Sequence, residues 1–281
     1  MDRGASMTDA NEWRGRTGDS WAAQWRRTDR SFGPLTERLL ARTREFAFGA
    51  ALDLGCGAGE LSLALARGRP HVAVTGVDIS PQLIEVARGR GAQLGNVAFE
   101  VADAADWFPA GAAPELLVSR HGVMFFDDPV AAFAHLAEVA APGAGLLFSC
   151  FRERGENPFF TEVAGLLPHP EAPPPPDAPG PFAFAERKRV EDVLTRAGWD
   201  SVAFEPFDFA MIAGGGADPV ADAVEYFSAI GPAARAASEL GPDERARFLE
   251  RVRELARRNL QDGLVSLRAA VWLVTARSGR R

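Results

Sequence analysis

The 281-residue sequence predicts an α/β fold in which helices cover a mostly parallel sheet. Three observations support this prediction. An apolar run over residues 46–54 enters a cluster of three glycines, and a helical pattern follows at once. A second β-branched run, 71–77, ends in the acid Asp78. Further strand patterns then alternate with helical ones as far as residue 151, which is typical of βαβ units.

The first turn contains Gly55, Gly57 and Gly59, with Cys56 between the first two. Glycine lets the backbone approach a ligand where a Cβ atom would collide. A dinucleotide site needs G-x-G-x-x-G, and here the last glycine comes one position early. Asp53 precedes the turn on the strand itself, where it would repel a pyrophosphate and attract a cation. The turn therefore favours a cationic nucleoside such as S-adenosylmethionine, which carries a sulfonium and an ammonium and no phosphate.

Asp78 ends the second strand about 20 residues after the glycine turn, where a carboxylate can accept both ribose hydroxyls of a nucleoside. The alternative, that Asp78 caps the next helix, is less favoured because Ser80 and Pro81 already form an N-cap and N1 pair. Ile79 would then pack on the adenine face. A helix is predicted over 81–94, and a short third strand over 97–101.

The fourth strand is predicted over 115–119, and its carboxyl end brings Ser119, Arg120 and His121 to the crevice where open α/β sheets bind ligands. Asp128 before Pro129 is a structural N-cap pair, with a helix over 130–140 and a strand over 145–151 after it.

Residues before the first strand form an amphipathic helical pattern that contains Phe32, Leu35, Leu39 and Leu40. Trp21 and Trp25 are four residues apart, on one face of a single predicted helix. This helix either packs on the sheet edge or forms a lid through which the two tryptophans contact the cofactor.

The second half of the chain is less regular. The proline-rich segment 168–181 predicts an extended surface connection. A helix over 185–197 ending at Gly198, a strand over 202–209, helical patterns over 218–262 and a last strand over 269–276 follow.

The strings DLGCGAGELSLALA, TGVDIS, VADAADWF and VSRHGVMFFDDP occur in order at sheet spacing. They resemble the motifs of class I S-adenosylmethionine-dependent methyltransferases, and those of the UbiE-like branch in particular. The resemblance implies a Rossmann-like seven-stranded sheet of order 3-2-1-4-5-7-6 with the last strand antiparallel. It also implies that Asp103 accepts from the adenine amine, while the backbone N–H of Ala104 contacts a ring nitrogen. Alternatively, Asp103 is a solvated loop acid.

The resemblance further implies a division of the chain. Residues 1–45 would be an N-terminal helical lid, and 46–151 the cofactor-binding half of the core. Residues 152–281 would complete the core with two helical inserts, at about 152–184 and 214–264, that cap the crevice and select the substrate.

The predicted reaction is methyl transfer to a small-molecule acceptor by in-line displacement, with S-adenosylmethionine as cofactor. The phenylalanines and alanines of the inserts suggest an apolar cavity and so a lipophilic or aromatic acceptor. His121 is either a general base or a wall residue. Arg120 either holds a substrate carboxylate or phosphate, or pairs with Asp127. The competing interpretations are a non-catalytic S-adenosylmethionine-binding or regulatory protein and a nucleotide-dependent oxidoreductase.

Composition restricts the remaining choices. The formal charge of −7 argues against a nucleic-acid binder, and the arginines of 245–258 are interleaved with glutamates as on a solvated helix face. No apolar run approaches the ~20 residues that span a bilayer. The two cysteines and the polar start, whether at Met1 or Met7, predict a cytoplasmic protein. The four histidines are not spaced for metal binding, so no metal site is predicted.

Overall fold

The computed structural model describes residues 10–169, 174–175 and 177–280. One sheet organises the chain, with strand order β3-β2-β1-β4-β5-β8-β6 and the short β7 paired to β8. The first five strands run parallel, and β8 is antiparallel to both β5 and β6. The predicted strand order is confirmed. The predicted seventh strand is numbered β8 because the short strand β7 precedes it. The strands are β1 Ala50–Leu54, β2 Ala73–Asp78, β3 Val97–Val101, β4 Leu116–Arg120, β5 Gly145–Phe151, β6 Trp199–Gly214, β7 Leu260–Gln261 and β8 Leu264–Ser278.

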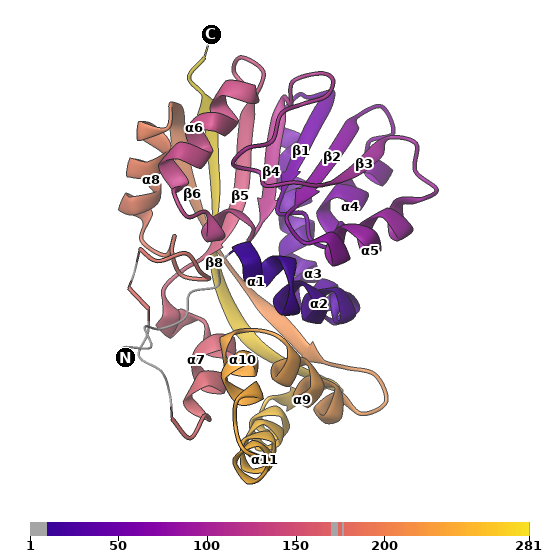
Figure 1. The fold of residues 1–281 in the computed structure, drawn as a ribbon, viewed down its shortest axis with the longest axis vertical. Helices are drawn as coiled ribbons and strands as arrows, with labels where there is room; N and C mark the ends of the chain where they lie inside the picture. Colours follow the sequence, from indigo (N-terminus) through magenta and orange to yellow (C-terminus); the bar gives the residue numbers. More distant parts are fainter. Residues whose placement is uncertain (1–9, 170–173, 176, 281) are drawn as a thin grey trace.

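Helices surround this sheet and extend beyond it (Figure 1). They are α1 Ala10–Arg14, α2 Arg16–Ala23, α3 Trp25–Arg42, α4 Glu60–Gly68, α5 Pro81–Gly91, α6 Pro129–Val139, α7 Pro158–Gly165, α8 Arg187–Arg196, α9 Pro219–Ala229, α10 Pro232–Ser238 and α11 Pro242–Arg258, with 3-10 turns η1 Thr43–Glu45, η2 Val123–Phe125 and η3 Arg154–Glu156. The predicted caps are confirmed: the Ser80 hydroxyl accepts from Leu83 N at 3.4 Å, and the Asp128 carboxylate accepts from Ala131 N at 3.0 Å.

Strands β6 and β8 are longer than the sequence pattern predicted. Pairing between them runs from Trp199 opposite Ser278 to Gly214 opposite Val265, whereas β8 pairs with β5 only from Arg277 to Val271. The rest of the pair leaves the sheet as a two-stranded ribbon that carries α9, α10 and α11 (Figure 1). The prediction that the sixth strand ends at residue 209 is wrong because α3 and α9 cover its continuation, including the buried Met211.

Helix α3 connects the sheet to these distal helices. Its buried face holds Phe32, Leu35 and Leu39, as the amphipathic pattern predicted. Arg42 pairs with Glu205 on β6 at 2.9 Å, and Arg27 pairs with Asp222 on α9 at 2.7 Å. These two ion pairs join α3 to β6 near one end of the helix and to α9 near the other.

The prediction that Trp21 and Trp25 share one helix is wrong. Trp21 lies on α2 and Trp25 begins α3. Gln24 is the single residue between the two helices. Because the chain changes direction here, α1 and α2 lie at the carboxyl ends of the strands, between the sheet and α10 (Figure 1).

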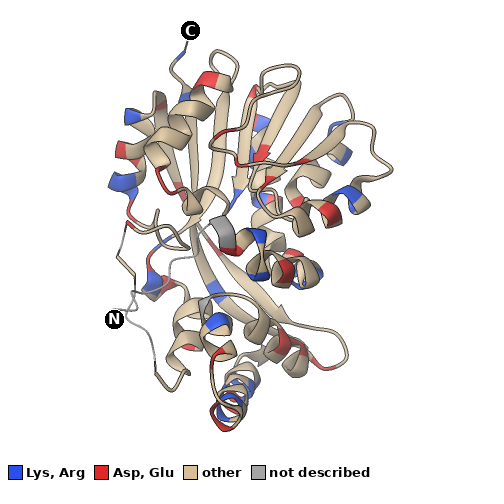
Figure 2. Ribbon diagram, viewed as in Figure 1, with Lys and Arg blue, Asp and Glu red and all other residues tan. Residues whose placement is uncertain are grey.

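Acidic and basic side chains are interspersed over the helices (Figure 2). On α11, Arg257 lies 3.4 Å from Glu250 and 3.6 Å from Glu254, as expected for a solvated helix face. None of the helices in the described part of the chain is long and apolar enough to cross a membrane.

Candidate cofactor and substrate site

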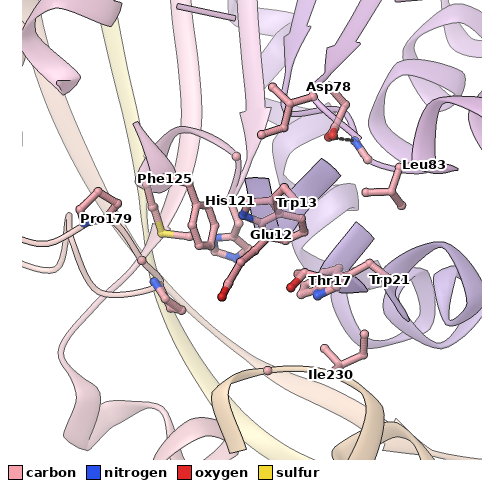
Figure 3. A pocket seen from close by; sticks show the side chains of 18 of the residues that line it. Glu12, Trp13, Thr17, Trp21, Asp78, Leu83, His121, Phe125, Pro179 and Ile230 are labelled. Atoms are coloured by element: carbon pink, nitrogen blue, oxygen red, sulfur yellow. Dashed lines mark hydrogen bonds between the residues drawn. The ribbon is translucent and has the colours of Figure 1, made fainter. Parts of the chain in front are cut away.

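A cavity of about 1090 Å³ lies at the carboxyl ends of β1 to β4. The sheet loops close one side, α1 to α3 a second, and α7, α9 and α10 a third (Figure 3). In a sheet of this order the strand connections reverse beside β1, and the loops separate there to leave a crevice. The predicted site residues fall on this crevice, with two exceptions described below.

The glycine turn exposes bare backbone to the cavity. Gly55 and Gly57 have φ of 63° and 55°, in the left-handed region that favours glycine. A Cβ at Gly57 would meet no heavy atom within 4 Å, so its backbone faces open space in the cavity wall. Cys56 between them is buried and lines the cavity, while its side chain packs in a core cluster that includes Phe99.

Gly59 and Ser119 do not line the cavity, and we correct their predicted roles. Gly59 precedes α4 with φ 83°, and a Cβ there would lie 2.8 Å from the ring of Phe99. The buried Ser119 hydroxyl donates to Leu54 O at 2.7 Å and accepts from Gly122 N at 3.0 Å. Gly59 therefore permits helix packing, and Ser119 ties the turn after β4 to β1.

Asp78 sits at the end of β2 with both carboxylate oxygens held by the backbone (Figure 3). Oδ2 accepts from Gly57 N and Oδ1 accepts from Ser80 N, each at 2.9 Å. Burial raises the pKa of this carboxyl, and the two N–H groups act in the opposite direction. Each oxygen keeps a lone pair that can accept from a ligand hydroxyl.

Asp53 is 1% exposed and accepts a hydrogen bond from the Ser62 hydroxyl at 2.6 Å. Burial raises the pKa of Asp53 to about 7, against the smaller opposing effects of Ser62 and Arg120. No Lys, Arg or His nitrogen of the described residues lies within 4 Å of this carboxylate. A buried acid without a cationic partner suits a cationic ligand.

The loops after β2 and β3 form another wall of the cavity. Ile79, Leu83 and Ala104 line it with apolar groups. Asp103 also lines the cavity, where its Oδ1 accepts from Ala105 N at 2.9 Å and leaves the other oxygen available. This pairing of apolar contacts with one acceptor is suited to a purine ring carrying an amine.

Arg120 lines the cavity, and of its two predicted alternatives the pair with Asp127 does not form. Its guanidinium donates to Thr36 Oγ1 at 2.8 Å and lies 3.5 Å from Asp29 on α3. Asp29 also pairs with Arg90 at 2.8 Å, and burial raises its pKa to about 6. The sequence analysis missed Asp29; an acid three residues before Phe32, on the buried face of α3, was the available signal.

His121 follows β4 in the left-handed region, with φ 66°. Its ring stacks on Phe151 at 4.1 Å between centroids and meets the edge of Phe32 at 5.3 Å. Burial, with help from the Arg120 charge, lowers the pKa of His121 to about 3; the Ser149 backbone opposes this too weakly to offset it. Neither ring nitrogen makes a hydrogen bond of normal geometry to any residue in the described ranges.

Both predicted lid tryptophans, Trp21 and Trp25, line the cavity. Trp21 packs against Trp13 on α1 at 5.5 Å, and Arg90 covers the Trp25 ring at 3.9 Å. Trp13 was missed by the sequence analysis; it also meets Phe125 at 5.2 Å (Figure 3).

The short N-terminal helices are docked at two points. A Cβ at Gly18 on α2 would lie 2.3 Å from the Ser80 hydroxyl, so α2 lies against the loop after β2. Glu12 on α1 pairs with Arg235 on α10 at 2.8 Å. The helices therefore lie across the cavity from the cofactor loops to α10.

The far wall of the cavity is aromatic. Phe160 contacts Phe151 at 4.9 Å and Phe182 at 5.3 Å, and Tyr226 lies 5.9 Å from Phe159. The proline-rich segment was expected on the surface, but Pro174 and residues 179–181 line this wall, and Gly180 N donates to Met124 O at 3.0 Å. The predicted positions 170–173 and 176 lie outside the described residues.

These residues fit S-adenosylmethionine. Gly57 provides open backbone, Asp78 has free lone pairs at the ribose position, and Asp53 is a buried acid without a cation. Asp103 and Ala104 lie where adenine would be held. A pyrophosphate would meet two carboxylates here instead of N–H donors.

Comparisons with known proteins identify methyltransferases as relatives. A family model described as a methyltransferase domain matches residues 51–143. A trans-aconitate 2-methyltransferase of Methylobacterium radiotolerans is 38% identical over 38% of this chain and 40% of its own length. An aklanonic acid methyltransferase of Streptomyces sp. strain C5 is 31% identical over 58% of this chain and 79% of its own length. The chain spans 40–55% of the length of the first several relatives.

A solved methyltransferase structure has a similar fold. Phosphoethanolamine N-methyltransferase 2 of Haemonchus contortus, solved with S-adenosyl-L-methionine, superposes with a TM-score of 0.58 at 14% identity, covering 100% of this chain and 62% of that one. This likeness concerns the fold alone. Together with the sequence relatives and the domain match, it agrees with the strand order and the glycine turn: the chain belongs to the class I S-adenosylmethionine-dependent methyltransferases.

Proposed function

We propose that this protein transfers the methyl group of S-adenosylmethionine to a small-molecule acceptor that binds against the aromatic wall of the cavity. The observation that carries the proposal is the continuity of the cavity from Asp53 and Asp78 to Phe160 and Phe182. A cofactor at the first end and an acceptor at the second would meet near His121. Within the family, the motif strings support the UbiE-like branch, and two cysteines that form no disulfide support a cytoplasmic location.

The bound cofactor supplies a methyl group that is already electrophilic, so the protein's main task is alignment. Orientation of this kind can lower a barrier by ~7–11 kcal/mol. Asp78 would fix the ribose, and Asp103 with Ala104 the adenine. Asp53, held by Ser62, would hold the ammonium end directly or through water. Trp21 and Trp25 would cover the cofactor from the N-terminal helices and exclude water.

His121 and Arg120 line the region where the two ligands would meet. With a pKa of about 3, His121 stays neutral at physiological pH and is a weak base. We therefore favour His121 as a hydrogen-bonding wall group that orients the acceptor, over the general-base alternative. Arg120 is neutralised by Asp29, which supports a positioning role for it through α3 rather than direct capture of an anion.

The acceptor is proposed to be lipophilic or aromatic because the wall opposite the cofactor loops is built from phenylalanines. Relatives named for trans-aconitate and aklanonic acid support a small-molecule acceptor.

Calorimetric titration with S-adenosylhomocysteine, S-adenosylmethionine and NAD tests the cofactor assignment. We expect one equivalent of either adenosyl ligand to bind and NAD to show no heat of binding. Firm binding of NAD with no binding of S-adenosylhomocysteine would reject the proposal. Mass-spectrometric detection of methylated product from a panel of aromatic acceptors then separates an enzyme from a non-catalytic binding protein.

A further inference from the structure

Four arginine side chains line the cavity, and they differ in how their charges are balanced. Asp29 neutralises Arg120 at 3.5 Å, and Glu12 neutralises Arg235 at 2.8 Å. In contrast, no carboxylate of the described residues lies within 4 Å of the guanidinium of Arg16 or Arg154. These two guanidinium groups are therefore available to an anionic ligand.

Arg154 is the better placed of the two. It begins the η3 turn directly after β5, and its guanidinium lies over the ring of Phe182, 4.6 Å from the centroid. Burial lowers its pKa, which means that part of its hydration has been lost. The nearby Glu156 is already paired with Arg152. Arg154 itself remains exposed, so an anionic ligand in the cavity can reach its guanidinium without displacing a carboxylate of the described residues.

The aromatic wall links Arg154 to the reaction end of the cavity. Phe182 beneath the guanidinium contacts Phe151 at 6.0 Å, and Phe151 stacks on His121. A flat or lipophilic acceptor lying along these rings would have one end beside His121 and the other beside Arg154. Within the described residues, the Arg16 guanidinium on α2 lies over none of these rings, and Arg16 is the alternative position.

We propose that the acceptor is an aromatic or lipophilic molecule bearing a carboxylate remote from the methylated atom, and that Arg154 binds this carboxylate. The planar guanidinium fork suits a bidentate contact with a carboxylate, and its face is already oriented by Phe182. The inference rests on the proposed function, because cofactor binding determines which end of the cavity is the reacting one.

The test compares two probes that differ in charge and little in shape, 2-naphthoate and 2-naphthamide, titrated into the protein saturated with S-adenosylhomocysteine. In the wild type we expect 2-naphthoate to bind at least tenfold more tightly. Arg154→Gln should weaken 2-naphthoate at least tenfold and change 2-naphthamide less than twofold. The matched control is Arg187→Gln, which removes a guanidinium over Phe204 and Trp272 outside the cavity and should change neither probe.

Three results would overturn the inference: equal affinity of the two probes, no binding of either probe at millimolar concentration, or a charge-specific loss in Arg16→Gln instead of Arg154→Gln. The affinity of every variant for S-adenosylhomocysteine is measured in the same experiment. Failure of the wild type to bind S-adenosylhomocysteine would reject the proposed function itself. Normal cofactor binding without charge preference would reject only the role of Arg154.

Discussion

The two ends of the cavity are built in different ways. At the cofactor end, the polar groups come from residues 53–104 and are held by neighbouring backbone, as Gly57 and Ser80 hold Asp78. At the acceptor end, the wall comes from segments far apart in sequence, and its groups are held mainly by ring contacts such as Phe151 with Phe160. The first end is therefore specified locally, whereas the second exists only when the distal helices and the sheet are packed together.

The largest effect is expected at the locally specified end. Asp78→Ala removes the acceptor of two backbone N–H groups and of the proposed ribose hydroxyls. We expect affinity for S-adenosylhomocysteine by calorimetry to fall at least hundredfold, about 2.8 kcal/mol. Asp192→Ala, which removes an exposed carboxylate from α8, serves as the control. Unchanged affinity in Asp78→Ala would remove this residue from the site.

The second prediction concerns the cost of burying acids at the cofactor end. Burial raises the pKa of Asp53 to about 7, whereas an unfolded aspartate titrates near ~3.9. Between these values the folded protein retains a proton that the unfolded chain has lost, so the free energy of unfolding falls as pH rises towards 7. Asp29, raised to about 6, acts in the same direction.

In Asp53→Asn, the fall in the free energy of unfolding between pH 5.5 and 7.5 should be smaller than in the wild type by about 1–2 kcal/mol. Urea unfolding at the two pH values measures it. Asp106→Asn, an exposed acid at the same cavity, should keep the wild-type slope. If the free energy of unfolding changed equally with pH in Asp53→Asn and in the wild type, Asp53 would not be the group that binds this proton.

A smaller effect on cofactor affinity is expected at α2, which lies between the cofactor end and the acceptor end of the cavity. In Gly18→Val the added side chain would collide with the Ser80 hydroxyl and move α2 off the loop after β2. Affinity for S-adenosylhomocysteine should fall about five- to tenfold, because Trp21 would lose its position; this corresponds to about 1 kcal/mol. Gly33→Val on α3, where no atom lies within 4 Å of a Cβ, is the matched control. Equal affinities of the two variants would show that α2 does not cover the cofactor.

The smallest effect on cofactor affinity is expected at His121, where the cofactor end and the acceptor end of the cavity meet. His121→Asn keeps a residue type that tolerates the left-handed backbone, and the ring it removes contacts Phe32 and Phe151 rather than the glycine turn. Affinity for S-adenosylhomocysteine should stay within twofold, while methyl transfer slows. A loss of more than tenfold in a folded variant would assign His121 to the cofactor end.

The same division explains what could be predicted from sequence. The helix caps at Ser80 and Asp128 and the positions of Asp53 and Asp78 follow from short motifs, since their partners are near in sequence or on the adjacent strand. The strand order and the position of Asp103 came from the family resemblance. Gly59 and Ser119 were assigned to the ligand because a motif does not show which of its members faces the core.

The acceptor end could not be predicted in the same way. Trp13 and Arg154 reach the cavity through packing of α1 and η3 with distant parts of the chain, and no spacing in the sequence encodes those contacts. The continuation of β6 past residue 209 was missed because α3 and α9, distant in sequence, supply the cover that makes those positions buried.

The paired strands β6 and β8 have a consequence for ligand exchange. The pairing of β6 with β8 runs without a register shift from Ala203 to Ile212. This two-stranded ribbon connects α9 to α11 with the sheet. Swinging those helices aside would require breaking that pairing. In contrast, Ala10–Ala23 is joined to α3 through Gln24 and is held by a few contacts, such as those of Glu12 and Gly18. We therefore expect both ligands to enter and leave by displacement of α1 and α2, while the β6–β8 ribbon stays in place.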